Sequence, residues 1–425
     1  MKHRTAVVGF GCAGYHAVKS MREEGYTGEI DVYTDTEWAP ANPMLTTYYI
    51  YGKLKKEGTL PFGPIRKLAE KYQFSIVTEN VEKVLSEEKE VLLADGQKNR
   101  YDQILISTGA RAFLPPIPGI NLDGVFPMRT VADAERLKSV LETRNVRQAI
   151  VVGASMVGIK LVELFYSRGI HCTLMDMAPY IFPISAVPEV AAEIESRLRE
   201  KNVDLIFSKA LEKIEADRDG QLRVMFADGE SISGDIVLMC IGTRANTQVA
   251  DEKIEINRGI VIDQKMQTNM PGIYSAGDCC EGNNLQTGQT QIIGIWDNAA
   301  RQGETAGVNM AGGNRRYHGN MLHNITHFMG MDFIGYGDNR MDGEEFTYED
   351  KEKGQMFVVR VKDGVPVCMN FLDSFGASGV FKSYMIQKLE GKKENLSPVA
   401  RVRMIRDGVP ERLINFLMKV ERENE

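Results

Sequence analysis

The sequence predicts an α/β protein with two layered sheet-and-helix domains and a smaller α+β domain at the C-terminal end. Strand-like and helix-like segments alternate along most of the chain, which is typical of α/β layers. One motif, an apolar run followed by a glycine turn and a helix-like stretch, occurs twice, as VVGFGCAG (7–14) and VVGASMVGIK (151–160). From about Tyr317 onward, strands and two amphipathic helices follow without such a turn.

The individual elements follow from apolar periodicity and turn residues. In the first part we expect strands at 5–8, 30–33 and 101–107, and helices at 13–24, 63–72 and 131–142. The stretch LPPIPG (114–119) is rigid and rich in turn residues, so we expect a linker there. The pattern then restarts with strand, turn, helix and strand from 148 to 175, and a meander follows between 203 and 240.

The first glycine turn has the composition of a dinucleotide-binding turn. Gly9 allows a tight turn, Gly11 lets the backbone approach a pyrophosphate, and Gly14 lets helix and strand pack closely. The N-terminus of the following helix presents free N–H groups to the negative charge. Asp35 follows the last glycine by 21 positions, at the end of the second strand, where a ribose hydroxyl needs an acceptor. The pattern predicts a Rossmann-like, three-layer domain around this turn.

The second glycine turn repeats the pattern with one change. Gly153 and Gly158 are kept, while Ser155 stands where the middle glycine is expected. A serine fits there if its side chain points away from the phosphates. Asp176 follows Gly158 by 18 positions and serves as the second ribose acid. Because Asp176 repels a 2′-phosphate and Met177 offers no compensating cation, the turn favours NADH over NADPH.

Beyond the two turns, the chain resembles the FAD-dependent pyridine nucleotide (disulfide) oxidoreductases, strongly over residues 1–310 and weakly afterwards. The resemblance rests on LISTGAR (105–111), MRTVADA (128–134), CIGTRANT (240–247), PGIYSAGDCC (271–280) and WDNAARQG (296–303). It implies FAD at the first turn and NADH at the second. The further cofactor-binding residues that it implies are Val81, Thr108, Gly109, Arg129, Gly242, Gly277, Asp278 and Trp296.

The order of these segments along the chain indicates three domains. A discontinuous FAD-binding domain takes residues 1–113 and 244–316, and an NAD-binding domain takes residues 114–243. Residues 317–425 form a C-terminal α+β interface domain. The last helix, 411–421, has an apolar face that packs either against the body of the chain or against a second copy, which leaves a homodimer through this domain open.

Within the family, the segment after the second strand separates the branches. This chain reads WAPANPMLTTYYIYG (38–52), without a cysteine, which resembles the RPPLSKEYLxG stretch of rubredoxin and ferredoxin reductases. That branch lacks a redox-active thiol. The lysine of this stretch is Thr47 here, and the glutamate of the family's GxxGxE motif is Lys160.

Lys160 and Thr47 are therefore our candidate catalytic residues. The corresponding family side chain reaches toward the reactive edge of the flavin, so a lone cation at Lys160 is expected to stabilise anionic reduced flavin or to orient a small acceptor. The alternative is a solvated lysine on a helix flank. The sequence leaves both interpretations open.

Composition excludes several other classes of function. The net charge is −7 and 26% of the residues are charged, so the chain has no overall positive charge that would attract nucleic acid or an anionic membrane. No apolar run approaches the roughly 20 residues of a membrane span. The six cysteines are scattered without a CxxC motif, which favours a reducing, cytoplasmic location. We expect no metal site, because no acidic cluster joins the histidines at 318, 323 and 327.

Together, these features predict an NADH-dependent FAD oxidoreductase. Hydride passes from NADH to FAD, and the electrons go on to an acceptor, first of all a protein carrier such as rubredoxin or ferredoxin. A small organic acceptor (quinone, O2 or an activated alkene) is the first alternative. The second is an NADH-sensing flavoprotein without rapid turnover.

Overall fold

The chain forms two compact units. The computed structural model describes residues 3–217, 220–391 and 396–423. The first unit comprises Met1–Ala112, Arg129–Lys138 and Thr243–Asn320, and the second comprises Phe113–Met128, Ser139–Gly242 and Met321–Glu425. The expected NAD-binding and C-terminal domains thus lie together in the second unit, and their separation into two domains stays a prediction.

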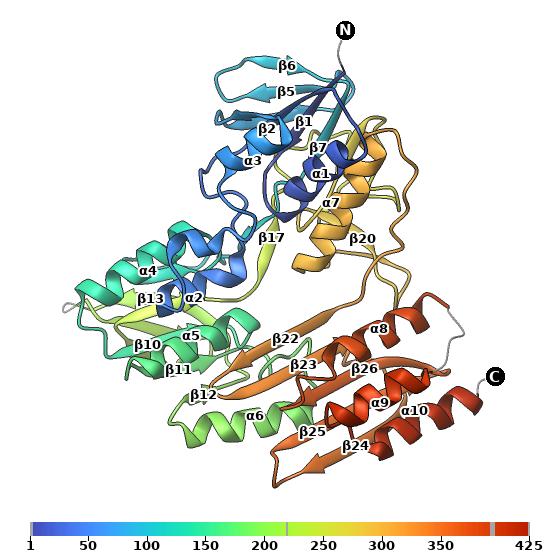
Figure 1. Ribbon diagram of the computed structural model, residues 1–425. Coiled ribbons are helices and arrows are strands. Elements are labelled where there is room, and N and C mark those ends of the chain that lie inside the picture. Colours follow the sequence, from blue (N-terminus) through green and yellow to red (C-terminus); the bar gives the residue numbers. More distant parts are fainter. Residues whose placement is uncertain (1–2, 218–219, 392–395, 424–425) are drawn as a thin grey trace. The chain divides into compact units, whose positions relative to one another are not determined.

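A parallel five-stranded sheet forms the centre of the first unit (Figure 1). Its strand order is β19 (Ile273–Ser275), β7 (Gln103–Ile106), β1 (Arg4–Val8), β2 (Glu29–Tyr33) and β3 (Ser75–Val77). The central strands β1 and β7 are buried along almost their whole length, as parallel strands between two covering layers must be. Strand β19 comes from the third segment of the unit, Thr243–Asn320, so the discontinuous chain completes this sheet.

Two helices, α1 (Cys12–Glu23) and α7 (Trp296–Met310), pack closely in this unit. A Cβ atom at Gly303 would lie 2.3 Å from the carbonyl oxygen of Ala13, and one at Gly307 equally close to that of Ala17. Only glycine allows the two backbones to approach this far. The helices therefore fix the segment that follows β19 against the first glycine turn.

Smaller elements complete the unit. They are α2 (Thr46–Tyr51), α3 (Ile65–Tyr72), the meander β4 (Val81–Leu85), β5 (Glu90–Leu93) and β6 (Lys98–Arg100), the pair β8 (Ala110–Ala112) and β17 (Thr243–Ala245), and the sheet β18 (Ile260–Val261), β20 (Cys280–Asn283) and β21 (Thr290–Gln291). The sequence analysis missed the β4–β6 meander, because three short strands with mixed polarity give little periodicity.

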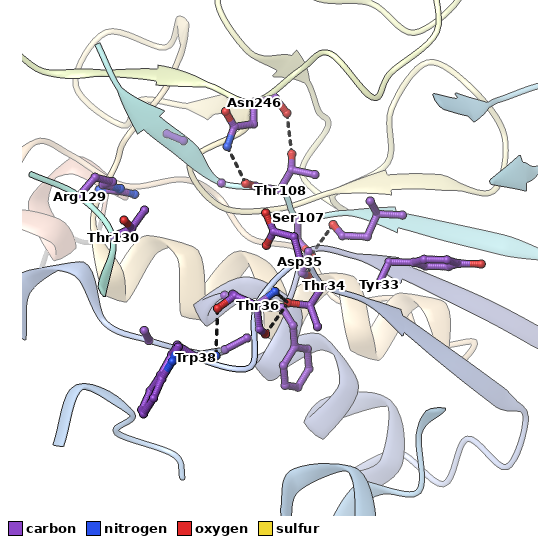
Figure 2. A pocket seen from close by; sticks show the side chains of 18 of the residues that line it. Tyr33, Thr34, Asp35, Thr36, Trp38, Ser107, Thr108, Arg129, Thr130 and Asn246 are labelled. Carbon is purple, nitrogen blue, oxygen red and sulfur yellow. Dashed lines mark hydrogen bonds between the residues drawn. The ribbon is translucent and has the colours of Figure 1, made fainter. Parts of the chain in front are cut away.

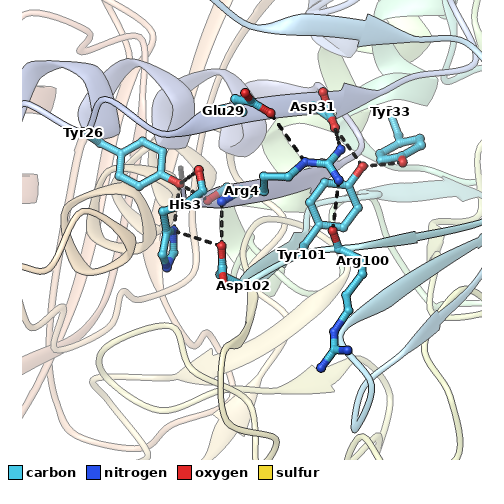
Figure 3. A network of polar contacts seen from close by, with 10 residues as sticks. His3, Arg4, Tyr26, Glu29, Asp31, Tyr33, Arg100, Tyr101 and Asp102 are labelled. Atoms are coloured by element: carbon cyan, nitrogen blue, oxygen red, sulfur yellow. Dashed lines mark hydrogen bonds and ion pairs between the residues drawn. The ribbon is translucent and has the colours of Figure 1, made fainter. Parts of the chain in front are cut away.

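A polar network closes the amino-terminal edge of the parallel sheet (Figure 3). The guanidinium group of Arg4 pairs with Asp31 at 2.9 Å and with Glu29 at 3.6 Å. The hydroxyl of Tyr101 donates to Asp31 at 2.9 Å and lies 2.7 Å from the hydroxyl of Tyr33. Burial raises the pKa of Tyr101, so the phenol stays protonated and keeps donating.

The second unit contains another parallel sheet of five strands. Its order is β12 (Asp204–Ile206), β11 (His171–Met175), β10 (Gln148–Val152), β16 (Ile236–Met239) and β9 (Val125–Pro127). The same unit contains two helices, α5 (Met156–Ser167) and α6 (Pro188–Glu200). It also contains a three-stranded antiparallel sheet of β13 (Leu211–Ala216), β14 (Leu222–Phe226) and β15 (Ser231–Gly234). Helix α4 (Val131–Thr143) begins in the first unit and ends in the second. The predicted α/β class with two Rossmann-like sheets is confirmed.

The C-terminal part of this unit is an antiparallel sheet with helices on one face. The strand order is β22 (His323–Phe328), β23 (Met331–Gly337), β26 (Val365–Leu372), β25 (Gln355–Lys362) and β24 (Glu344–Asp350). Helices α8 (Ser378–Leu389), α9 (Pro398–Arg406) and α10 (Glu411–Glu423) share one apolar core with it. We expected two helices, and the described residues form three.

The sequence analysis did not predict helix α9. Its exposed side carries the apolar residues Val399, Val402 and Ile405, so its sequence lacks the amphipathic pattern of a packed helix. By contrast, the pattern of α10 was informative. Leu413 and Leu417 are buried against the sheet of the same chain, which decides between the two surfaces considered for this helix.

Candidate functional site

The first glycine turn connects β1 to α1 and leaves room for a ligand. Gly9 has φ +94°, and a Cβ atom there would lie 2.4 Å from the carbonyl oxygen of Ser107. A Cβ atom at Gly14 would lie 2.4 Å from the carbonyl oxygen of Gly9. At Gly11, no atom lies within 4 Å of such a Cβ, and no side chain caps the helix. The first-turn N–H groups of α1 thus remain available to an anion.

A cavity of about 730 Å³ lies at the carboxyl ends of the strands of this unit (Figure 2). Of the predicted cofactor-binding residues, those that line it are Gly9, Gly11, Asp35, Val81, Thr108, Gly109 and Arg129. The loop after β2 also contributes Thr36 and Trp38. An open α/β sheet binds its ligands in this position.

Asn246 is a lining residue that the sequence analysis did not single out, although it lies inside the quoted motif CIGTRANT. Its amide donates to the carbonyl of Thr108 at 3.0 Å, and the hydroxyl of Thr108 donates to the carbonyl of Asn246 at 2.6 Å. This exchange, visible in Figure 2, fixes the end of β7 to the segment after β17.

Arg129 joins the cavity to the second predicted FAD motif. Its guanidinium group pairs with Asp278 at 2.6 Å, across 149 positions of sequence. Both side chains are largely buried, with exposed fractions of 23% and 17%. The neighbouring Gly277 has φ +90° and donates its N–H to Gln302 on α7 at 2.8 Å. Two predicted motifs therefore meet at one polar contact.

Trp296, at the start of α7, lies beside the first turn. Its ring stacks against Phe62 with centroids 5.9 Å apart, and its carbonyl oxygen lies 3.5 Å from the sulfur of Cys12. The other predicted cofactor-binding residues of this unit do not line the cavity; they are Gly14, Gly277, Asp278 and Trp296.

The cysteines of the chain are buried and free. Burial raises the pKa of each thiol, to about 12 for Cys240 and Cys368. Cys279 and Cys280 are fully enclosed, and burial raises their pKa values as well. At neutral pH these groups are thiols rather than thiolates, so they are poor nucleophiles.

The second glycine turn connects β10 to α5. Gly153 has φ +111°, and a Cβ atom at Gly158 would lie 2.1 Å from its carbonyl oxygen. The hydroxyl of Ser155 donates to the carbonyl of Cys240 at 2.9 Å and accepts from the N–H of Gly158 at 3.2 Å. The serine side chain thus turns into the protein and caps α5, which leaves the outer side of the turn clear.

Asp176 lies at the end of β11, next to this turn. Its carboxylate accepts the N–H of Ala154 at 2.8 Å and that of Ala178 at 2.9 Å. The side chain of Met177 is 76% exposed. Gly242, between β16 and β17, has φ +99°, and a Cβ atom added there would lie in open space. Two backbone amides, one of them in the glycine turn, therefore fix the carboxylate that is expected to bind the ribose of NADH.

Lys160 is neither a lone cation nor a solvated lysine. Its residue is 7% exposed, and its ammonium group pairs with Glu163 on the same helix and donates to the carbonyl of His327 at 2.7 Å. Glu163 was missed, although its i+3 position on the predicted helix was a usable signal. Thr47 is buried in α2, in the other unit. A catalytic role for either residue stays a prediction.

In the part of the chain that the structure describes, no helix has the length and apolarity to cross a membrane. Within the same ranges, no three His, Cys, Asp or Glu side chains form a group that could hold a metal ion.

Comparison with known proteins gives one family. The family model described as pyridine nucleotide-disulphide oxidoreductase matches residues 3–303. An NADH oxidase of Methanocaldococcus jannaschii is 30% identical over 316 residues, covering 73% of this chain and 70% of that protein. The ferredoxin--NAD(+) reductase component of the 3-phenylpropionate/cinnamic acid dioxygenase of Photorhabdus laumondii is 29% identical, covering 73% and 79%. The NADH-dependent phenylglyoxylate dehydrogenase subunit epsilon of Aromatoleum evansii is 25% identical over 404 residues, 92% of both chains.

Proposed function

Since the chain belongs to the pyridine nucleotide-disulphide oxidoreductase family and is an NADH-dependent flavoprotein oxidoreductase, we propose that it passes electrons from NADH through FAD to a protein carrier of the rubredoxin or ferredoxin type. The observation that supports this acceptor is the absence of a usable thiol. Residues 38–52 contain no cysteine, and the cysteines of the chain are buried, so no dithiol relay stands between flavin and acceptor.

The residues of the first unit fit FAD. The uncapped N-terminus of α1 and the open position at Gly11 suit a pyrophosphate. Asp35, on the wall of the cavity, suits a ribose hydroxyl, and Asp278, held by Arg129, suits the ribityl chain. Bound FAD would supply a carrier that takes up two electrons from a hydride donor and releases them to an acceptor.

The residues of the second unit fit NADH. Ser155 consumes one N–H of the first turn of α5 and leaves the others to the pyrophosphate. Asp176, oriented by two backbone amides, accepts from the ribose hydroxyls and repels a 2′-phosphate. Hydride transfer from bound NADH to bound FAD would need no acid or base from the protein, whose part would be to bind and orient the two cofactors.

A small acceptor is the second candidate, because a relative of 30% identity is named NADH oxidase. A further alternative, an NADH-sensing role, rests on no separate observation. We place the enzyme in the cytoplasm, since six free thiols fit a reducing compartment. A homodimer through the C-terminal part stays an untested prediction, and the apolar face of α10 no longer supports it, because that face packs within its own chain.

Stopped-flow reoxidation tests the acceptor. Enzyme reduced anaerobically with NADH is mixed with rubredoxin, ferredoxin, a quinone or O2, and flavin absorbance is followed. We expect the protein carriers to reoxidise the enzyme fastest at equal concentration. Faster reoxidation by O2 or quinone would replace the carrier by a small acceptor, and slow reoxidation by all would leave the sensor.

A further inference from the structure

The hairpin of β22 and β23 contacts helix α5 through a buried ion pair. The side chains of Lys160 and Glu163 are 8% and 11% exposed and pair with each other on α5. The ammonium of Lys160 also donates to the carbonyl of His327, at 2.7 Å. The carboxylate of Glu163 accepts the N–H of Met329, at 3.3 Å. Each charge therefore binds one backbone group of the hairpin.

The same hairpin reaches the second glycine turn by an apolar route. Phe182 is 1% exposed and donates its N–H to the carbonyl of Ala154, inside the turn, at 3.0 Å. Its ring stacks on Phe333 with centroids 5.1 Å apart and meets Phe328 edge-on at 5.7 Å. Both phenylalanines belong to the hairpin. Two independent contacts thus connect the turn and its helix to residues beyond the family match, which ends at 303.

The polarity of the four groups makes the polar contact directional. The carbonyl of His327 needs a donor at position 160, and the N–H of Met329 needs an acceptor at position 163. Removing one member of such a buried pair leaves an uncompensated charge, which is strongly unfavourable. A lysine held in this way acts on its helix, and the helix begins at the turn for which we propose NADH.

We infer that Lys160 and Glu163 are positioning residues that clamp α5 onto the β22–β23 hairpin and thereby hold the second glycine turn in the geometry that binds the NADH pyrophosphate. This inference rests on the proposed function, which places NADH at this turn. It replaces a direct action of Lys160 on the flavin.

The experiment compares variants of the FAD-loaded enzyme. We measure kcat and KM for NADH with ferricyanide as acceptor, Kd for NAD+ by calorimetry, the flavin midpoint potential, and hydrogen exchange of the Met329 amide. For Lys160→Met and Glu163→Gln we expect KM and Kd to rise about tenfold, kcat to stay within twofold, the potential to stay unchanged, and Met329 to exchange faster. Lys160→Arg, which keeps the donor, should behave like the wild type.

Two further variants sharpen the test. The exchange Lys160→Glu with Glu163→Lys keeps an ion pair but presents the wrong group to each hairpin atom, so we expect no rescue. Arg199→Met is the matched control, because Arg199 pairs with Glu195 on α6 at 3.2 Å and is 56% exposed. It should leave all four measurements unchanged.

Several results would overturn the inference. A lower kcat or a shifted potential with unchanged KM would place the action of Lys160 at the flavin. Unchanged KM and Kd, or full rescue by the exchanged pair, would remove the clamp. If Lys160→Met does not fold, Glu163→Gln decides by the same criteria. A wild-type enzyme that binds neither NADH nor NAD+ would refute the proposed function itself, whereas normal binding with unaffected variants refutes only the clamp.

Discussion

Replacing Gly11 with alanine tests the first glycine turn, because the geometry separates the effect of a methyl group on folding from its effect on FAD binding. Gly11 has an extended backbone with φ −82° and ψ −156°, so alanine needs no left-handed conformation there, and its added Cβ meets no protein atom within 4 Å. Gly9 in the same turn differs. There the Cβ would lie 2.4 Å from the carbonyl oxygen of Ser107, at φ +94°.

The expected magnitudes follow from these positions. Gly11→Ala should change the free energy of unfolding of the apoprotein by no more than a gain of about 0.4–1 kcal/mol, since it only restricts the unfolded chain. The methyl group would point into the cavity and displace the pyrophosphate. The loss of one hydrogen bond to a charged group is worth about 1.5–3 kcal/mol, and at about 1.36 kcal/mol for each factor of ten FAD should bind roughly 13- to 160-fold more weakly.

Gly9→Ala is the contrasting variant. Left-handed strain of about 1–2 kcal/mol and overpacking of about 1–3 kcal/mol should together destabilise the apoprotein by roughly 2–5 kcal/mol. The assays are urea unfolding of apoprotein followed by circular dichroism, and FAD titration followed by the quenching of flavin fluorescence. Wild-type FAD affinity in Gly11→Ala would refute the assignment of this turn to FAD.

Three further predictions concern the cofactor choice, the thiols and pH. The wild type should show a higher kcat/KM with NADH than with NADPH, and Asp176→Ala should reduce this preference at least tenfold; a wild type that uses both equally would contradict the role of the carboxylate. The double variant Cys279→Ser, Cys280→Ser should keep NADH oxidation and acceptor reduction within twofold in steady-state assays, and loss of acceptor reduction alone would reveal a redox pair. Burial lowers the pKa of His16 despite the nearby carboxylate of Glu304, so the unfolded state binds the proton first and stability should fall as the pH drops below about 6.5. His16→Gln should flatten this decline in urea unfolding between pH 7 and 5, and an unchanged slope would exclude His16 as its source.

Sequence patterns located both glycine turns because their requirements are local. Gly9 and Gly153 must adopt positive φ, and each lies between an apolar strand and a helix, so residue type and spacing are sufficient to identify them. The position of Asp35 on the cavity wall follows from the same spacing, because the carboxyl ends of neighbouring parallel strands lie at one edge of the sheet.

Contacts between distant segments leave no comparable local pattern in the sequence. Arg129 and Asp278 were each assigned to FAD through the family resemblance, yet their pairing joins positions 149 residues apart. The three-stranded meander at 81–100 was missed because short strands of mixed polarity resemble loops. These contacts exist only once the sheet of the first unit is complete.

Lys160 shows most clearly what the sequence alone could and could not determine. The sequence determined its place on the first turns of a helix, and the i+3 spacing made Glu163 an available partner. It could not determine that this helix face is buried against residues 327–329, because that depends on how a hairpin more than 160 positions later packs. Only the tertiary structure removes water from the pair and supplies the two backbone groups, and this turns a candidate surface cation into a buried, directionally bonded lysine.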